Sequence, residues 1–392
     1  MDNISALILV GGRGKRLEAL TEGRTKPYVS FLGKYRIIDF VLSSLSNSHI
    51  TDIGILTQYE PYDLIKYIGN GGAFDLDAFG KGISFLTPYV NEGQQLVVQK
   101  GTAHACLTQI EFIKKSRSKY FLILSGDQIY KINFKDVLDE HIKNNANLTI
   151  LTNVYPKEDE LSRFGIIEAD ENNKILSFEE KPAHPKSNQI SMGIYLFNKD
   201  FLIKYIEQAE KYIDFGKDLI PHILENEDGI YAYPYKGKFF DVGTPVGYFD
   251  ASMYYLDHPE EISPHLDQQK IYSKPLYYTP LYIGEEAKVK SSYVAEGAKV
   301  YGSVRHSIIS YCDVIYRVAL SQELPNEVSK IRGGVGLLQV TDVRALQPSK
   351  AKPPIKVTLD GNETVFISLQ LLNVELSIIV TPSGIMTDVG SS

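Results

Sequence analysis

A glycine-rich loop directly after an apolar run constrains the N-terminal part of the chain more than any other feature. Residues 6–10 read ALILV, a run that can form a strand buried on both faces of a sheet. Gly11, Gly12 and Gly14 follow, and glycines let the backbone turn tightly and bring its N–H groups close to oxygens. Five cations supply countercharge in and after this loop: Arg13, Lys15, Arg16, Arg24 and Lys26. The segment therefore predicts a loop that binds a polyphosphate.

Two familiar nucleotide-binding loops fit this segment poorly. The dinucleotide-binding fingerprint requires a third glycine where Leu17 stands, and its loop is not normally so cationic. A P-loop ends in Gly-Lys-Ser or Gly-Lys-Thr, whereas residues 14–16 read GKR and residues 33–35 read GKY. The glycines taken alone also fit an ordinary turn between a strand and a helix. With the cations included, a third class of nucleotide loop remains.

The composition limits the class of protein. A chain of 392 residues, 43% of them hydrophobic, can bury a large core and is long enough for two domains. A net charge of -7 argues against a nucleic-acid binder, so the cations of the loop suit a small anionic ligand. Cys106 and Cys312 are too few and too far apart for a disulfide framework or a zinc site. No signal-peptide pattern or long apolar run is present, so we expect a cytoplasmic protein without membrane contact.

The order of apolar segments predicts an α/β domain. Helical spacing of apolar residues extends over residues 37–46. Strand-like runs occupy residues 5–10, 53–57, 120–125 and 148–154. This alternation predicts a layered domain with a mainly parallel sheet, and ligands of such sheets bind beyond the carboxyl ends of the strands. The glycine loop lies at such an end, as does Ser125-Gly126-Asp127.

Several strings resemble one enzyme family. GGRGKRL at 11–17, TKP at 25–27 and GKYRIIDF at 33–40 resemble the start of the sugar-1-phosphate nucleotidylyltransferases, which have a Rossmann-like catalytic domain. GKYRIIDFVLSSLSNS at 33–48 and GILTQY at 54–59 are similar to the ADP-glucose pyrophosphorylases, also called glucose-1-phosphate adenylyltransferases. The likeness continues to about residue 310.

Two aspartates are the carboxylates that we expect to bind Mg²⁺. Magnesium is held by one or two carboxylates plus substrate phosphates, so two aspartates at separate strand ends suffice. Asp127 alone also fits a turn residue that caps a helix. The resemblance assigns it to the metal and implies Asp241 as the second ligand. The family usually has His where this chain has Gln128 and Lys where it has Phe240, so a cation is lost beside Asp241.

The sugar-phosphate side is indicated by FGIIEAD at 164–170, FEEKP at 178–182 and SMGIYLF at 191–197. A sugar phosphate needs a cation for its phosphate and acceptors for its hydroxyls, and Glu180 beside Lys181 supplies both. Without context, such a pair is a solvated surface pair. The resemblance implies that four residues contact glucose 1-phosphate: Gly165, Glu180, Lys181 and Ser191. It also implies that Gln58 lies near the adenine.

The GTA motif that starts at Gly101 is preceded by a departure from the family pattern. Family members show Trp-Tyr-x-Gly-Thr-Ala, the tyrosine approaching the sugar phosphate, whereas Val98 and Gln99 stand in the aromatic positions here. Gly101 is expected among the substrate-binding residues. The sugar contact of this loop is expected to be weakened, or replaced by Lys100 unless that lysine simply faces solvent.

The resemblance implies a direct displacement, in which a glucose 1-phosphate oxygen attacks the α-phosphorus of ATP and pyrophosphate leaves. Catalysis then consists of holding two anions in line and neutralising charge. Arg16 and Lys26 would clamp phosphates, Lys181 would hold the sugar phosphate, and Mg²⁺ on Asp127 and Asp241 would bridge them. The catalytic set is thus Arg16, Lys26 and Asp127, and the nucleotide-binding set is Gly11, Gly12, Gly14, Arg16 and Lys26.

The C-terminal part shows a different spacing of apolar residues. We expect a catalytic domain at 1–257 and a linker at 258–275. Apolar residues then recur six apart, at Ile283 and Val289, Val294 and Val300, and Ile308 and Val314. This period is typical of a parallel β-helix, and YIGEEAKV and VRHSIIS resemble the opening coils of the family's left-handed β-helix, so coils are expected at 276–315. Ordinary strands are the alternative, and residues 316–392 lose the period and are expected to form a divergent region.

The predicted function is transfer of the adenylyl group of ATP to α-D-glucose 1-phosphate, which gives ADP-glucose and pyrophosphate for glycogen biosynthesis. A regulatory subunit with little turnover is one alternative, which the departures at Val98, Gln99 and Phe240 favour. A thymidylyl- or guanylyltransferase is another, because glycine loops and paired aspartates do not choose a base. A nicotinamide-dependent dehydrogenase is disfavoured by Leu17 and the basic loop.

The resemblance also bears on assembly and regulation. It implies an allosteric homotetramer, or a hetero-oligomer with a related subunit. Lys34 and Arg36 lie in a segment that resembles the family's effector region. As two cations in a loop, they are expected on plain surface.

Overall fold

The computed structural model describes residues 3–11, 15–21, 24–77, 81–88, 99–262 and 269–311, together with short strands beyond residue 311. The chain divides into two compact units. The N-terminal unit comprises residues 1–13, 38–241 and 269–274, and the C-terminal unit comprises residues 14–37, 242–268 and 275–392. The predicted domain boundaries at residues 257, 275 and 315 stay predictions.

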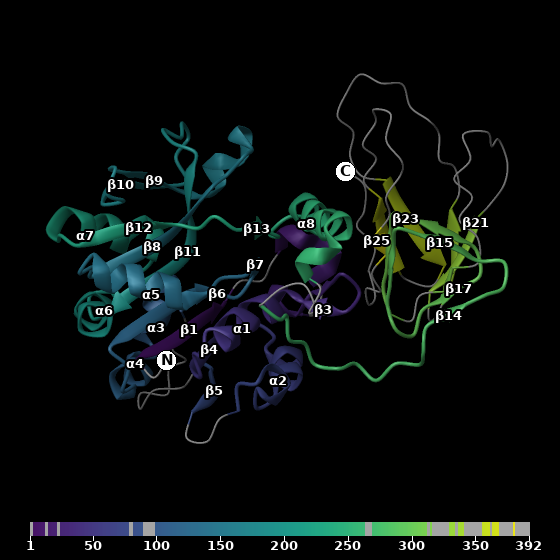
Figure 1. The fold of residues 1–392 in the computed structure, drawn as a ribbon, viewed down its shortest axis with the longest axis horizontal. Coiled ribbons are helices and arrows are strands. Elements are labelled where there is room, and N and C mark those ends of the chain that lie inside the picture. Colours follow the sequence, from purple (N-terminus) through teal and green to yellow (C-terminus); the bar gives the residue numbers. More distant parts are fainter. Residues whose placement is uncertain are drawn as a thin grey trace. The chain divides into compact units, whose positions relative to one another are not determined.

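A nine-stranded mixed sheet forms the centre of the N-terminal unit (Figure 1). Its main path runs through β10 (Ile175–Glu180), β9 (Gly165–Ala169), β11 (Gln189–Asn198), β6 (Tyr120–Ser125), β1 (Ile4–Val10), β4 (Asp52–Thr57) and β5 (Gly82–Leu86). β8 (Leu148–Val154) pairs with β11, and β12 (Ile230–Pro234) pairs with β8. Only β10 and β11 run against the other strands, so the sheet is mixed and mainly parallel, as predicted.

The apolar runs of the sequence form the central strands. The runs predicted at 5–10, 53–57, 120–125 and 148–154 are β1, β4, β6 and β8, each within one residue of its predicted start and end. Apart from strand ends such as the exposed Val154, most of their side chains are buried on both faces of the sheet, because helices cover it. The helix predicted at 37–46 is α1 (Ile37–Asn47), which is buried along almost its whole length.

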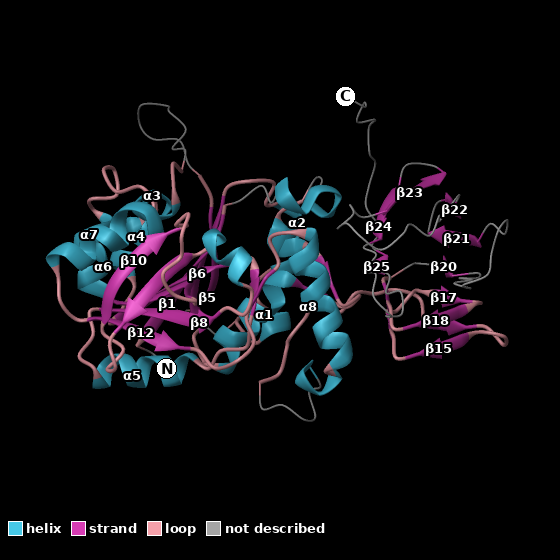
Figure 2. Cartoon of the chain, turned by 90° about the horizontal axis from the view of Figure 1, so that it is seen from above, coloured by secondary structure: helices cyan, strands magenta, loops and turns pink. Residues whose placement is uncertain are grey.

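Helices lie on both sides of the sheet (Figure 2). The view shows α3, α4, α6 and α7 on one side and α5 on the other. The helices of the N-terminal unit after α1 are α2 (Tyr62–Ile68), α3 (Thr102–Leu107), α4 (Ile110–Lys115), α5 (Phe134–Lys143), α6 (Lys199–Ile206) and α7 (Ile220–Asn226). In the part of the chain that the structure describes, no helix is both long and apolar enough to cross a lipid bilayer.

Short parallel ladders dominate the described beginning of the C-terminal unit. The strands are β14 (Tyr282–Ile283), β15 (Lys288–Lys290), β16 (Tyr293–Val294), β17 (Lys299–Val300), β18 (Ser303–Arg305), β19 (Ile308–Ile309) and β20 (Val314–Ile315). β14 pairs with β17 and β17 with β20, β15 pairs with β18, and β16 pairs with β19, all in parallel. The chain therefore returns to each of three ladders in turn, and the β-helix coils expected at 276–315 stay a prediction.

Beyond β20 the pairing changes. β21 (Ser329–Gly333), β22 (Gly336–Val340), β23 (Ile355–Asp360) and β24 (Glu363–Ile367) pair successively in antiparallel fashion, and β21 pairs antiparallel with β20. β25 (Ile379–Val380) pairs in parallel with β19. Antiparallel strands do not need the six-residue repeat, which is consistent with its loss after residue 315.

The expectation that Lys34 and Arg36 lie on plain surface is wrong for Arg36. Lys34 is exposed, but the Arg36 side chain is buried within the C-terminal unit. Its Nη1 donates a hydrogen bond of 2.8 Å to Ser30 Oγ, and its guanidinium lies 5.0 Å from the ring centre of Tyr28 and 5.6 Å from that of Tyr311. Burial is possible because aromatic faces and a hydroxyl replace water around the cation.

His141 is a buried titratable group in α5, on the side of the sheet opposite the larger helix layer. Its Nδ1 lies 2.7 Å from Thr149 Oγ1 and its Nε2 lies 3.3 Å from Asn198 Oδ1. A neutral imidazole can accept one of these bonds and donate the other. Burial lowers the pKa of His141 from 6.5 to about 4, so the ring is neutral in the folded protein at pH 5 and above.

We predict that His141 makes the stability of the N-terminal unit fall between pH 7 and pH 5. In this range the unfolded chain binds a proton at His141 and the folded chain does not, which costs about 2 kcal/mol of stability at pH 5. A His141→Gln variant has no such proton to bind, so its urea midpoint should change less between the two pH values. An equal change in both proteins would contradict a neutral, buried His141.

Candidate functional site

The two predicted metal ligands are brought together by a very short antiparallel sheet. β7 (Gln128–Ile129) pairs with β13 (Phe240–Asp241), with Asp241 directly opposite Gln128. Asp127 immediately precedes β7, at the carboxyl end of β6, and Ser125 Oγ donates to its Oδ1 over 2.5 Å. Two carboxylates far apart in the sequence therefore occupy neighbouring positions of the backbone.

These donors fit a magnesium site of the kind predicted. Among the described residues, no group of three or more His, Cys, Asp or Glu side chains could hold a metal ion. A pair of aspartates is the donor set of an ion that takes its remaining ligands from water and substrate phosphates. Gln128, which replaces the family's usual histidine, is opposite Asp241, and its buried Oε1 has no hydrogen-bond partner among the described residues.

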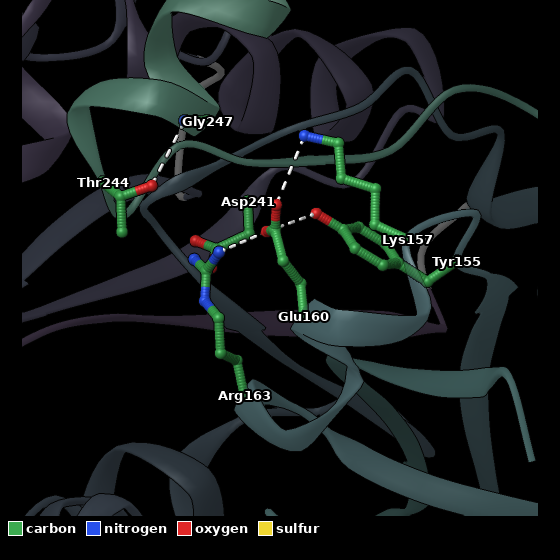
Figure 3. A network of polar contacts seen from close by, with 7 residues as sticks. All are labelled: Tyr155, Lys157, Glu160, Arg163, Asp241, Thr244 and Gly247. Carbon is green, nitrogen blue, oxygen red and sulfur yellow. Dashed lines mark hydrogen bonds and ion pairs between the residues drawn. The ribbon is translucent and has the colours of Figure 1, made fainter. Parts of the chain in front are cut away.

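Asp241 also belongs to a network of ion pairs (Figure 3). Arg163, at the end of a 3-10 helix (Glu158–Arg163), lies with Nη2 2.7 Å from Asp241 Oδ2 and Nη1 2.5 Å from Glu160 Oε2. Glu160 also contacts Lys157 Nζ at 3.2 Å and accepts a hydrogen bond of 3.2 Å from Tyr155. Burial, followed by the charge of Glu160, raises the pKa of Tyr155 to about 12. Arg163 was not among the predicted site residues, and its only local signal is its place directly before the FGIIEAD motif.

The residues predicted to bind the sugar phosphate meet at the ends of β9 and β10. Glu180, the last residue of β10, pairs with Gly165, the first residue of β9. Lys181 follows in the left-handed backbone region, with a φ of 50°, and its Nζ lies 2.7 Å from Glu180 Oε1. A non-glycine residue in this region is uncommon and marks a position that the surrounding structure fixes. In the β9–β11 ladder Ile190 pairs with Ile166, which puts Ser191 at the level of Gly165.

Two glycines leave room for the carboxylate of Glu180. A Cβ on Gly165 would lie 3.0 Å from Glu180 Oε2, and a Cβ on Gly216 would lie 2.5 Å from the same atom. Any side chain at residue 216 would therefore displace the carboxylate. Gly216 was not among the predicted site residues, and its motif, Asp-Phe-Gly-Lys-Asp at 214–218, is the signal that could have found it.

The GTA motif is tied to the segment that carries Gly216. A Cβ on Gly101 would lie 2.5 Å from the carbonyl oxygen of Ile213, so this close approach requires glycine. Thr102 Oγ1 donates to Asp214 Oδ2 at 2.9 Å and accepts from the backbone N–H of Phe215 at 2.9 Å. Asp214 Oδ1 in turn accepts from the N–H of Gly216 at 3.0 Å. Gly101 thus contacts the backbone segment that borders Glu180, and its role toward the sugar phosphate stays a prediction.

Lys100 is engaged with an acidic side chain in this structure. Its Nζ lies 3.1 Å from Glu210 Oε2, and both side chains are exposed. The buried ring of His104 bridges the same two residues, because its Nδ1 accepts from the Lys100 N–H at 3.3 Å and its Nε2 lies 3.4 Å from Glu210 Oε1. A sugar contact by Lys100 stays a prediction.

The predicted nucleotide side lies at the carboxyl ends of β1 and β4. A Cβ on Gly11 would lie 3.7 Å from Gln58 Oε1 and 3.8 Å from Gln99 Oε1. The backbone of Gly11 is therefore close to the side-chain amides of both glutamines. Gln99, in the position of the family's tyrosine, is therefore beside the first glycine of the loop. Gly12, Gly14 and Val98 lie outside the described residues.

The remaining predicted residues, Arg16 and Lys26, belong to the C-terminal unit. Arg16 lies in a 3-10 helix (Lys15–Thr21) with an exposed side chain. Lys26 begins a second 3-10 helix (Lys26–Tyr28) and is buried. Their roles toward phosphates stay predictions.

Comparison with known proteins identifies the family of this chain. Residues 5–258 match the family model described as Nucleotidyl transferase. The chain is 44% identical over 331 residues to a protein of Clostridioides difficile (strain 630) named glucose-1-phosphate adenylyltransferase, and the match covers 82% of this chain and 85% of the relative. Because the family model spans more than half of the chain and the identity extends over most of both proteins, the chain belongs to the nucleotidyl transferase family and, within it, to the glucose-1-phosphate adenylyltransferases.

Proposed function

We propose that this protein transfers the adenylyl group of ATP to α-D-glucose 1-phosphate, giving ADP-glucose and pyrophosphate for glycogen biosynthesis. The observation that carries the proposal is the β7–β13 pairing, which puts Asp127 and Asp241 at neighbouring positions. The name of the Clostridioides difficile relative supports the choice of substrates.

Asp127 and Asp241 are the residues that would hold Mg²⁺. When bound, the ion withdraws negative charge from phosphate oxygens, which favours attack at phosphorus and departure of pyrophosphate. A phosphate oxygen of glucose 1-phosphate is already an anionic nucleophile at neutral pH. For this reason the protein needs neither a nucleophile of its own nor a general base, and its task is to hold and orient two anions.

The other site residues would each help to hold or orient one of the two anions. Glu180 would accept hydrogen bonds from sugar hydroxyls, while Lys181, one residue on, would face the sugar phosphate. Gly11 leaves space for the nucleotide beside Gln58, whose carboxamide offers the base both a donor and an acceptor. Arg16 and Lys26 would neutralise the polyphosphate as pyrophosphate develops its charge.

The C-terminal unit and the assembly carry separate proposals. The three alternating parallel ladders between β14 and β20 support coils of a β-helix, which we propose to be left-handed. We also propose an allosteric homotetramer, or a hetero-oligomer with a related subunit, in the cytoplasm. Exposed apolar side chains near the first coil support association: Tyr277, Tyr282, Ile283, Val289 and Tyr301.

A nucleotide panel tests the proposed function. Pyrophosphate release is measured with glucose 1-phosphate, Mg²⁺ and each of ATP, TTP and GTP, and we expect clear preference for ATP. Preference for TTP or GTP would identify a different sugar-phosphate nucleotidylyltransferase. No release with any nucleotide would instead favour the regulatory subunit, which the departures at Val98, Gln99 and Phe240 allow.

We predict that Asp127→Asn lowers kcat by at least about 100-fold at saturating Mg²⁺. Losing the partner of a metal ligand typically costs about 10–100-fold, so losing a ligand should cost no less than the upper end of that range. The amide is nearly isosteric, and circular dichroism and the thermal midpoint should match those of the unchanged protein. Turnover within a few-fold of normal would remove Asp127 from the metal site.

We predict that Gly216→Ala raises the KM for glucose 1-phosphate by about tenfold, the cost of about one weakened hydrogen bond to a charged group. The new methyl group would lie 2.5 Å from Glu180 Oε2, and the end of a flexible side chain can move away without unfolding the protein. The KM for ATP should stay unchanged, and Glu180→Gln should raise the same KM. An unchanged KM for glucose 1-phosphate in Gly216→Ala would show that the carboxylate position does not matter for this substrate.

A further inference from the structure

We propose that Arg163 is a positioning residue for Asp241, fixing the carboxylate in the orientation in which it receives the metal ion. The inference rests on the proposed function, because it assigns a role toward the Mg²⁺ of that reaction. It goes beyond that function by adding a residue that lies far from Asp241 in the sequence and was not among the predicted site residues.

The geometry of the pair supports positioning rather than loose charge attraction. The two terminal nitrogens of Arg163 contact different carboxylates, Nη2 at 2.7 Å from Asp241 Oδ2 and Nη1 at 2.5 Å from Glu160 Oε2. The distance to Asp241 is that of a charge-assisted hydrogen bond, and the contact with Glu160 is shorter still. The side chains of Arg163 and Asp241 are only 22% and 16% exposed, so water competes weakly for these bonds. A planar guanidinium held at two points cannot swing freely.

Glu160 anchors the guanidinium from the other side. Besides Arg163, it contacts Lys157 Nζ at 3.2 Å through Oε1 and Tyr155 Oη at 3.2 Å through Oε2 (Figure 3). The two cations and two carboxylates of this network balance in charge, so Arg163 is stabilised where it stands. The position of Asp241 is therefore coupled to the segment 155–163 that precedes the sugar-side strand β9.

The contact is compatible with a metal ion on the same carboxylate. A carboxylate has two oxygens and about four lone-pair directions, so a donor at Oδ2 leaves coordinating capacity on the group. Carboxylates that bind metals are themselves commonly hydrogen-bonded, and this outer contact fixes their orientation. Arginine only donates hydrogen bonds, so its contact with Oδ2 does not prevent the carboxylate from serving as a metal ligand.

Arg163 also supplies the cation that the residue before Asp241 lacks. That residue is Phe240, which carries no charge. Arg163 touches the carboxylate directly. We infer that the charge balance of the site in this chain comes from Arg163.

Mn²⁺ binding provides the test, because it reports the site without turnover. Mn²⁺ is titrated by electron paramagnetic resonance into the full-length protein with α,β-methylene-ATP, in which the α–β bridge cannot be cleaved. Arg163→Gln should weaken Mn²⁺ binding by about 10–100-fold. Arg163→Lys keeps the positive charge but loses the planar guanidinium that contacts two carboxylates at once, and it should weaken binding less. Lys157→Gln is the matched control, since it removes a cation that contacts Glu160 and not Asp241, and it should change the affinity by less than about threefold.

The controls separate this inference from the proposed function. Asp127→Asn and Asp241→Asn should both lose the tight Mn²⁺ signal, and if neither does, the proposed metal site itself is wrong. If both do and Arg163→Gln and Arg163→Lys bind Mn²⁺ as tightly as the unchanged protein, the role of Arg163 alone is overturned. Equal weakening by Lys157→Gln would also overturn it, because general charge loss would then explain the effect. In kinetics, Arg163→Lys should raise the Mg²⁺ activation constant and leave the KM for glucose 1-phosphate unchanged.

Discussion

The pairing of β7 with β13 is the contact on which the candidate site depends. It spans only two residues on each side, yet it brings Asp241 opposite Gln128 and next to Asp127. Two backbone strands of this length contribute little stability of their own, so the large sheet on one side of β7 and the Arg163 network beside β13 must hold them in place. A divalent ion that takes only two ligands from the protein requires this kind of fixed placement, because small displacements of either carboxylate lower its affinity.

The predicted sugar side depends on a different physical constraint, which is the space that glycines leave for neighbouring groups. Gly216 approaches the Glu180 carboxylate so closely that a Cβ there would require this group to move, and a Cβ on Gly165 would lie 2.5 Å from the Phe178 ring and 3.0 Å from the carboxylate. Gly101 lets the GTA motif approach the carbonyl oxygen of Ile213, and Thr102 then fixes Asp214 and Phe215. Glycines at the predicted sugar side thus set where the polar side chains lie.

Local sequence patterns predict the parts of this protein that depend on local physics. The apolar runs predict β1, β4, β6 and β8 because buried parallel strands need continuous apolar side chains, and the six-residue recurrence predicts the ladders from β14 to β20. Asp127 and Glu180 lie at strand ends, and the family resemblance predicts them as site residues. Pairing between distant segments has no such local signal.

The missed features are all contacts between distant segments. Arg163 meets Asp241 only through folding, and Gly216 borders Glu180 only because its segment packs on the end of β10. Arg36 was expected at the surface, and its burial depends on Tyr311, which lies in the coils of the C-terminal unit. Strands as short as β7 and β13 also show no periodicity that a sequence pattern could reveal.

A double-mutant cycle on Asp127 and Asp241 tests the central claim, that the two carboxylates hold one metal ion. The kcat of pyrophosphate release is measured for Asp127→Asn, Asp241→Asn and the double variant at saturating ATP, glucose 1-phosphate and Mg²⁺. Residues that act as a unit give non-additive losses, so the double variant should be within about threefold of the slower single variant. If the two single losses instead multiply in the double variant, the aspartates act independently and the shared metal site is wrong.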